Sequence, residues 1–203
     1  MQIVNLFPTP IGAKEMDREI TTEEHKFFDE LERYRNVGNQ SSVNSYILNE
    51  EPLHNLKEVF EIQLNEYFSQ IFRPNTDVTP YITQSWLNWT TGNQWHHNHR
   101  HPNSFISGVY YVEAEEDDSI TFTNPIHENW MLRFTTDNWT HYNSHDWWVP
   151  ARKGTLLLFP SWLGHQVKNK KRDDNVSRIS LAFNTFCKGM IGTEEDLTQL
   201  VIS

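Results

Sequence analysis

The chain has 203 residues, a length that suits one domain with a sizeable buried core. Its 27 acidic and 17 basic residues give a formal net charge of −10, which repels phosphate and argues against general binding to nucleic acid or to anionic membranes. Cys187 is the only cysteine, and the N-terminus has no basic segment followed by a long apolar run. These features exclude an intrachain disulfide and predict a cytoplasmic protein without a signal peptide or membrane span.

The N-terminal part predicts a short edge strand and two helices. Residues 2–11 are apolar but are interrupted by prolines, and an edge strand at residues 2–7 could pair across a homodimer. Thr21 and Glu24 have capping-box spacing, which predicts the start of a helix. Residues 37–48 are polar and are predicted to be a loop. A longer helix is predicted after it, with apolar residues at Leu53, Leu56, Phe60, Leu64, Tyr67, Phe68 and Ile71.

After residue 76 the pattern changes to short β-branched and aromatic runs separated by turn residues. Helices followed by many strands indicate a mainly β fold, a sandwich or jelly roll braced by helices on one face. We expect one domain over residues 1–203, with the first strand and helices in 1–75, the jelly-roll core in 76–187 and a tail in 188–203. Helical periodicity returns only in the acidic tail. The predicted strands cover residues 79–90, 95–101, 105–113, 118–123, 130–135, 145–149, 154–159, 164–168 and 176–186.

The segment from Trp95 to Ser104 contains four of the ten histidines. Because side chains alternate along a strand, His97, His99 and His101 are predicted to share one face, with His96 on the other. Two imidazoles of an H-x-H pair can hold one metal ion. The segment therefore predicts part of a metal site, although a loop whose histidines merely pack is the alternative.

A second segment, far along the chain, could complete this site. His165 follows an apolar strand and a Pro-Ser-Trp turn, which makes it the best candidate for a third ligand. Arg178 and Ser180 then alternate on one face of the last strand, where a guanidinium and a hydroxyl could bind a carboxylate. A surface arginine on an edge strand is the alternative, but the histidine cluster favours the metal site.

These motifs resemble the Fe(II)- and 2-oxoglutarate-dependent oxygenases, in particular a small subgroup with many phage-encoded members. The resemblance implies a double-stranded β-helix, which is a jelly roll related to the cupins, and activity in a cytoplasm, that of the host if the protein is phage-encoded. The segments that carry it are Asn5–Ile11, His99-Arg100-His101-Pro102-Asn103-Ser104, Ser107-Gly108-Val109-Tyr110-Tyr111, Leu158–His165 and Arg178–Asn184.

The resemblance also implies roles for individual residues. His99, His101 and His165 would bind Fe(II), with His97 in reserve, and His101 would stand where most members have Asp or Glu. No other catalytic residue is implied. The co-substrate 2-oxoglutarate and the unidentified substrate would contact further residues: Arg178, Ser180, Asn88 and Tyr110 for 2-oxoglutarate, and His96, Asn103 and Trp148 for the substrate.

The implied reaction is that of a dioxygenase, a hydroxylase that couples decarboxylation of 2-oxoglutarate to oxidation of a substrate by O2. One alternative is a cupin-like enzyme with three histidine ligands that does not use 2-oxoglutarate. Another is a non-catalytic jelly-roll module that binds a partner or has a structural role. Arg178 with Ser180 favours the oxygenase, because a co-substrate carboxylate explains both residues. The aromatic residues 139–148 either line the substrate entrance or pack as a strand and lid.

Overall fold

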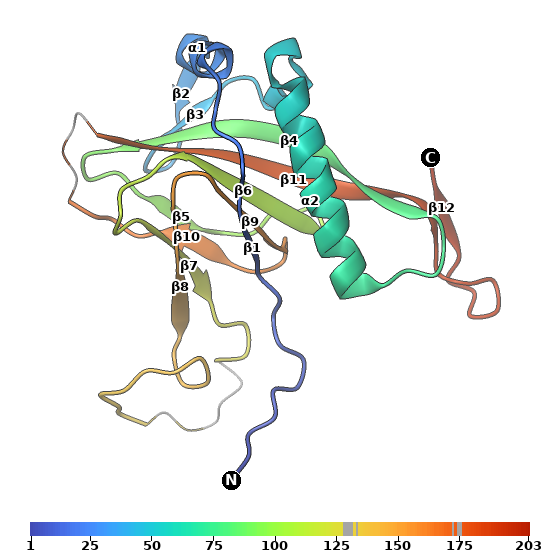
Figure 1. Cartoon of the computed structure of the whole chain (residues 1–203). Coiled ribbons are helices and arrows are strands. Elements are labelled where there is room, and N and C mark those ends of the chain that lie inside the picture. The colour runs from blue at the N-terminus through green and yellow to red at the C-terminus, as the bar shows by residue number, and fades with distance from the viewer. Residues whose placement is uncertain (128–131, 133, 172, 174–175) are drawn as a thin grey trace.

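The computed structural model describes residues 1–127, 132, 134–171, 173 and 176–203. Two antiparallel sheets pack face to face, and the two α-helices lie on the outer side of the larger sheet (Figure 1). The major sheet has eight strands in the order β1-β9-β6-β11-β4-β3-β2, with β12 paired to β11, and the minor sheet has the order β5-β10-β7-β8. This is the predicted jelly-roll arrangement of a double-stranded β-helix.

The N-terminal elements confirm the two predicted helices and place the first strands differently. Residues 2–7 form no strand, and residues 37–48, predicted as a loop, include a short strand because Gln40 and Ser41 pair with β4. The capping box is present, since Thr21 Oγ1 accepts from the amide of Glu24 at 3.2 Å. The elements are β1 (Gly12–Glu15), α1 (Thr22–Glu30), β2 (Arg33–Arg35), β3 (Gln40–Ser42), the 3-10 helices η1 (Ile47–Asn49) and η2 (Glu51–Leu53), and α2 (His54–Phe72).

The predicted strands after residue 76 match the structure closely, with two differences. Half of the predicted strand 130–135 lies on residues outside the described part of the chain, and its described residues 132, 134 and 135 form no strand. The acidic tail forms a strand instead of a helix, and β11 continues past the predicted boundary at residue 187. The strands are β4 (Val78–Thr91), β5 (His96–His99), β6 (Ile106–Glu113), β7 (Ser119–Thr123), β8 (Asp146–Pro150), β9 (Thr155–Pro160), β10 (His165–Val167), β11 (Ser177–Ile191) and β12 (Leu200–Ile202).

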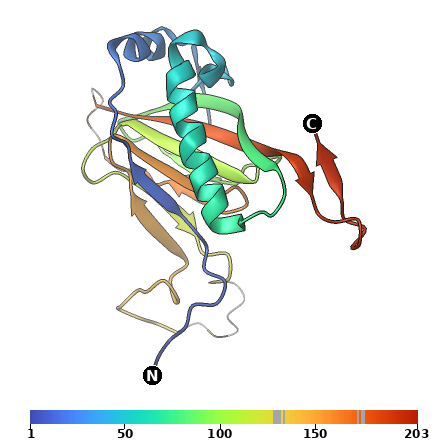
Figure 2. The same cartoon turned by 45° about the vertical axis from the view of Figure 1, so that its right-hand side comes forward.

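Helix α2 lies across the major sheet and covers its outer face (Figure 2). Its apolar stripe is buried as predicted, except that Ile71 at its end is 42% exposed. The ring of Phe60 stacks on Phe183 of β11 at 5.6 Å and contacts Tyr110 of β6 at 5.2 Å. This helix-side core supports the major sheet on the face away from the minor sheet. None of the helices in the described residues is long and apolar enough to cross a membrane.

A second core fills the space between the two sheets. It includes Val109 and Tyr111 of β6 and Phe159 of β9, whereas Tyr110 and Val112 face the helices. Strand β6 is thus buried on both faces, and successive side chains enter different cores. The candidate site lies between the sheets, beside this second core.

Candidate metal centre

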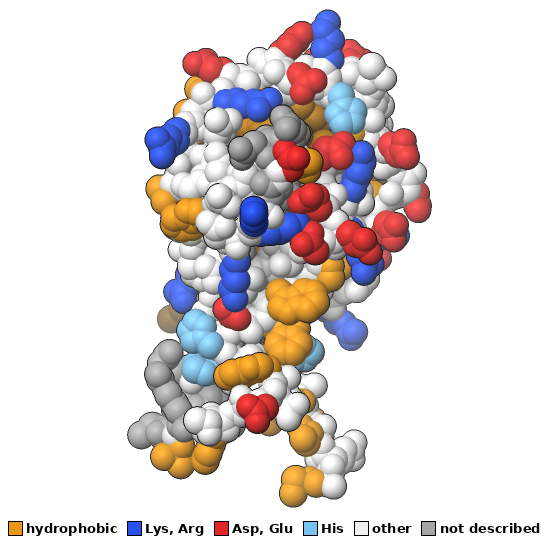
Figure 3. All heavy atoms as spheres, turned by 90° about the vertical axis from the view of Figure 1, so that its left-hand side faces the viewer, with side chains coloured by type: hydrophobic (Ala, Val, Ile, Leu, Met, Phe, Trp, Pro, Cys, Tyr) orange, Lys and Arg blue, Asp and Glu red, His pale blue; other side chains and the backbone are white. Residues whose placement is uncertain are grey.

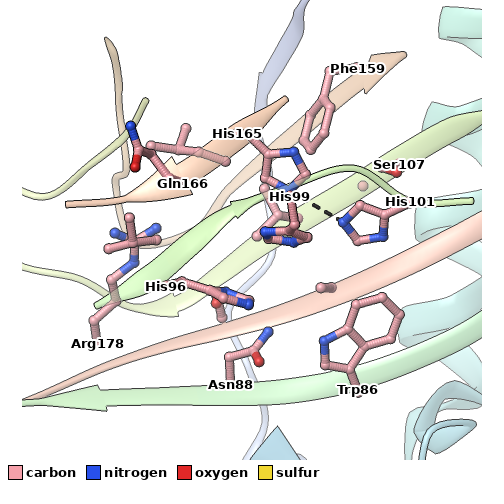
Figure 4. A pocket seen from close by; sticks show the side chains of 16 residues that line it. Trp86, Asn88, His96, His99, His101, Ser107, Phe159, His165, Gln166 and Arg178 are labelled. Atoms are coloured by element: carbon pink, nitrogen blue, oxygen red, sulfur yellow. Dashed lines mark hydrogen bonds between the residues drawn. The ribbon is translucent and has the colours of Figure 1, made fainter. Parts of the chain in front are cut away.

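Three histidines from the predicted site meet between the sheets (Figure 4). His99 on β5 pairs directly with His165 on the antiparallel neighbour β10, and His101 follows the end of β5. One ring nitrogen from each lies within 4.8 Å of the other two. The structure therefore brings together the three residues that the sequence singled out as ligands.

Hydrogen bonds on the far side of each ring decide which nitrogen faces the centre. Nδ1 of His99 donates to the carbonyl oxygen of His97 at 2.8 Å, and Nδ1 of His165 donates to that of Leu163 at 3.1 Å. Because a carbonyl only accepts, each Nδ1 carries the hydrogen and each Nε2 keeps its lone pair. This is the usual outer contact of a metal-binding histidine.

His101 is oriented in the same way by a side chain. Its Nδ1 lies 2.6 Å from Oδ1 of Asn184, and its Nε2 lies 3.3 Å from Nε2 of His165. Two imidazoles bound at right angles to one divalent ion, each about 2.1 Å from it, have nitrogens about 3 Å apart. Two lone pairs that face one another at this distance fit a metal ion between them.

Burial keeps these histidines neutral, which is the form that binds metal. His165 is 6% exposed, and loss of solvent lowers its pKa well below the ordinary value. Burial also lowers the pKa of His101 to about 4 and the pKa of His99 in the same direction. The imidazoles thus compete little for protons at neutral pH.

The strand alternation predicted for His96 and His97 is wrong. Between β10 and β5, His165 pairs with His99 but Val167 pairs with His96, so the four residues His96–His99 of β5 face the three residues His165–Val167 of β10. This bulge turns His96 to the side of the site, where its ring stacks on His99 at 4.4 Å. His97, the reserve ligand, is not among the three that share one centre.

Arg178 and Ser180 both line a small cavity of about 40 Å³ next to the histidines, as does Asn88. Arg178 is 3% exposed, and its Nη1 donates to the carbonyl of Ser119 at 2.8 Å. It forms no ion pair with any residue that the structure describes. A buried guanidinium without an anionic partner is costly, so the site is suited to an anionic ligand.

Tyr110 does not line this cavity, so the prediction that it contacts the co-substrate is not supported. Its ring packs on Phe60 in the helix-side core. The neighbouring Tyr111 packs in the core between the sheets, with the guanidinium of Arg178 at 5.1 Å from its ring centroid, and it does not line the cavity either. The hydroxyl of Tyr111 is buried, and the guanidinium of Arg178 is the polar group beside it. It was missed because the Y-Y pair alone does not show which ring faces inward.

Two further residues near the metal centre were not predicted. Asn184 orients His101, and the ring of Trp86 stacks on His101 at 5.6 Å. Asn184 ends the R-x-S-x-x-F-N motif, so the sequence did carry a signal for it. Trp86 lies in a strand rich in aromatic residues and has no such signal.

A larger open groove of about 820 Å³ runs from the histidines toward β2 and β3. Asn103 lines this groove, and His96 lines both the groove and the cavity.

Trp148 lines neither the groove nor the cavity, since it is 60% exposed on β8, at the opposite edge of the minor sheet from β5. Hydrophobic side chains gather in the lower part of the face that Figure 3 shows. Trp139 and Tyr142 are also exposed, so the predicted aromatic entrance is not part of the pocket.

Comparison with known families agrees with this site. Residues 84–184, which include all three histidines, match the family described as "Putative 2OG-Fe(II) oxygenase". The chain belongs to the Fe(II)- and 2-oxoglutarate-dependent oxygenases, as the sequence motifs predicted. No curated protein matches the chain.

Solved structures show the same fold. A prolyl hydroxylase from Trichoplax adhaerens, in complex with a peptide fragment of hypoxia inducible factor, is 12% identical, with a TM-score of 0.58 over 87% of this chain and 83% of its own. A prolyl-4-hydroxylase from Pseudomonas putida is 12% identical, with a TM-score of 0.52 over 87% and 92%. HygX from Streptomyces hygroscopicus, solved with nickel, 2-oxoglutarate and hygromycin B, is 12% identical, with a TM-score of 0.54 over 87% and 82%. At these identities the similarity concerns the fold.

Proposed function

We propose that the protein is a hydroxylase in which His99, His101 and His165 hold Fe(II) and Arg178 binds 2-oxoglutarate. The observation that carries the proposal is Arg178, a buried cation without an ion-pair partner among the described residues, across a small cavity from three neutral imidazoles. A dicarboxylate that reaches from the metal to Arg178 satisfies both ends of this cavity.

The donor set fits a divalent ion of the transition series. Three Nε2 lone pairs point to one centre, and three histidines leave coordination positions open for reactants. Bound Fe(II) supplies the chemistry of O2 activation and substrate oxidation. The protein orients the reactants and excludes water from the cavity, which buried Ile120 and Phe159 help to line.

At the far end of the cavity, three groups are placed to hold the co-substrate. Arg178 has donors beyond the one that binds Ser119, and its fork matches a carboxylate. Ser180 pairs with Asn88 on β4 and with Tyr111 on β6 in the strand register. The buried ring of Tyr111 packs beside the guanidinium and helps to hold it in position.

The ligand set differs from the pattern of two histidines and a carboxylate. Among the described residues, no Asp or Glu joins the group, and we infer that His101 takes the place of the carboxylate ligand. Three neutral ligands leave the ion with its full charge, so we infer weaker retention of Fe(II) and stronger attraction for the dianionic co-substrate.

The groove next to the metal centre is the proposed binding site of the substrate. Its lining includes hydroxyl, amide and imidazole groups, and Arg100 is the one formally charged residue among the described residues that line it. None of these described lining residues is acidic, although the chain carries 27 acidic residues. We infer that the substrate is a neutral or anionic polar group. The prolyl hydroxylases of the same fold support hydroxylation as the reaction.

The proposal is tested with the purified protein under anaerobic conditions. Fe(II) and 2-oxoglutarate together should produce the weak visible charge-transfer band of the bound pair, and O2 should then release succinate. His165→Ala should abolish the band. Arg178→Ala should raise the 2-oxoglutarate concentration needed for half of the band by at least about thirtyfold, because a buried charge pair contributes roughly 2–5 kcal/mol.

His97→Ala is the matched control, since it removes a histidine of the same segment that is outside the triad. It should keep the band. A band that survives His101→Ala but is lost in His97→Ala would show that the second ligand is wrong. Metal binding without any response to 2-oxoglutarate would favour the cupin-like enzyme. An activity or partner binding that is indifferent to metal would favour the non-catalytic module.

We also infer that residues 1–203 act as one oxygenase domain in a cytoplasm. The lone cysteine supports a reducing compartment. A homodimer is supported by the exposed apolar side chains of Ile3, Leu6 and Phe7, which are 68%, 76% and 95% accessible. Sedimentation at micromolar concentration tests the dimer, and a monomer at all concentrations contradicts it.

A further inference from the structure

His96 has a position in the site that neither metal binding nor the proposed carboxylate clamp explains. It lines the same cavity as Arg178 and the three ligand histidines, and Figure 4 shows it between Arg178 and His99. Its ring stacks on His99 with an interplanar angle of 27°. It is not among the three histidines that share one centre. Its nitrogens therefore do not complete the metal site.

Several of the other polar side chains around the cavity are held by hydrogen bonds. Nδ1 of each ligand histidine donates to an oxygen, Arg178 donates to Ser119, and Asn88 accepts from Ser41 at 2.8 Å. His96, like Gln166 and Ser180 on the same lining, makes no side-chain hydrogen bond within the described part of the chain. A partly buried imidazole that lacks partners has a donor and an acceptor available for a ligand.

The small size of the cavity makes the mobility of the His96 ring relevant to binding of the co-substrate. A free volume of about 40 Å³ holds on the order of three water molecules, less than a five-carbon dicarboxylate needs. Movement of one lining side chain would make room for the co-substrate. The ring of His96 contacts the imidazoles of His97 and His99, and its rotation breaks no hydrogen bond between described residues.

We propose that His96 is a co-substrate-binding residue: its ring rotates away from His99 as 2-oxoglutarate enters, and its N–H donates to a carboxylate oxygen of the bound molecule. This inference rests on the proposed function. The bulge in β5 is the structural device that makes it possible, because a regular strand would direct His96 away from the cavity. The backbone of Asn88 faces Ser180 across the β4–β11 pair, and its side chain points toward His96 (Figure 4), so the two side chains can hold one carboxylate together.

The test compares His96→Phe, which keeps a ring but has no N–H, with His96→Gln, which keeps an N–H donor. 2-Oxoglutarate is titrated into anaerobic Fe(II)-loaded protein, followed by the visible band and by calorimetry. His96→Phe should raise the Kd for 2-oxoglutarate about ten- to hundredfold, as expected for loss of a hydrogen bond to a charged group. His96→Gln should restore most of the affinity. Fe(II) affinity, measured by competition with a chelating dye, should not change in either variant.

His97→Phe is the control, since it alters the adjacent ring without touching the cavity, and it should leave the Kd for 2-oxoglutarate unchanged. An unchanged Kd in His96→Phe overturns this inference alone. Loss of Fe(II) binding in folded His96→Phe and His96→Gln also overturns it, since His96 is then a metal ligand. Wild-type protein that binds no 2-oxoglutarate by either readout overturns the proposed function as well.

Discussion

The chemistry of the site depends on how single side chains are oriented by residues that do not touch the metal. His101 is held by Asn184, while His99 and His165 are held by backbone carbonyls. A backbone acceptor cannot be removed by substitution, but a side-chain acceptor can. Asn184 is therefore the one position in this outer set of hydrogen bonds where mutation can separate ligand orientation from ligand identity.

Asn184→Leu should lower metal affinity about ten- to hundredfold, because the Nδ1–H of His101 loses its acceptor while all three ligands remain. Affinity is measured by competition with a chelating dye. Asn98→Leu is the control: Asn98 bonds Thr123 at 2.6 Å and belongs to β5, but it does not line the cavity. Equal affinity in the Asn184 and Asn98 variants contradicts the orienting role.

At the scale of elements, the site is formed by strands of the major sheet whose other face packs against the helices. Strands β4, β6 and β11 carry Asn88, Tyr111 and Arg178, and the helix-side core presses on their other face. Gly108 in β6 shows how close this packing is, since a Cβ there would lie 2.1 Å from the ring of Phe183. The same ring stacks on Phe60 of α2.

Phe60→Ala should destabilise the protein by about 3–5 kcal/mol, since the helix loses a fully buried ring that contacts β6 and β11. Ile62→Ala, on the exposed side of the same helix, should change stability by less than about 0.5 kcal/mol. Urea unfolding followed by circular dichroism measures both. Similar losses in the two variants would mean that α2 is not held by its Phe60 face.

At the scale of the whole molecule, none of the described residues that line the cavity or the groove is acidic. Acidic and basic side chains intermix over the upper part of the face in Figure 3. The basic run near residue 170 is neutralised in part, because Lys168 pairs with Asp146 at 2.9 Å and Lys170 pairs with Glu115 at 2.9 Å. Two lysines of this run are thus paired with acidic side chains, whereas none of the described residues that line the groove is acidic.

Metal and co-substrate should stabilise the folded chain, because they bind a site whose residues are distant in sequence. A ligand at a hundred times its Kd adds about 2.7 kcal/mol, which for a chain of this size raises Tm by roughly 5–10 °C. Thermal unfolding is compared in chelator, with Ni(II), and with Ni(II) plus 2-oxoglutarate. His165→Ala should show no shift, and a shift equal to that of the wild type would place the bound metal elsewhere.

Much of the fold could be predicted from residues that are close together in the sequence. The capping box at Thr21, the apolar stripe of α2 and nearly all described strands of the core depend on near neighbours in sequence, and each was predicted. The short strand at residues 40–42 was not predicted, because its polar residues form a strand only by pairing with β4.

The sequence by itself determined which residue types could form the site: the H-x-H pair, His165 and the R-x-S motif. Tertiary structure decided which of them face it. Strand β6 is buried on both faces, so no polar-apolar alternation distinguishes Tyr110 from Tyr111. His96 enters the cavity because of a bulge, and a bulge is a property of two paired strands rather than of one. Alternation along a strand predicts which side chains lie on the same face. Only pairing with strands that are distant in sequence decides which of the two faces lines the site.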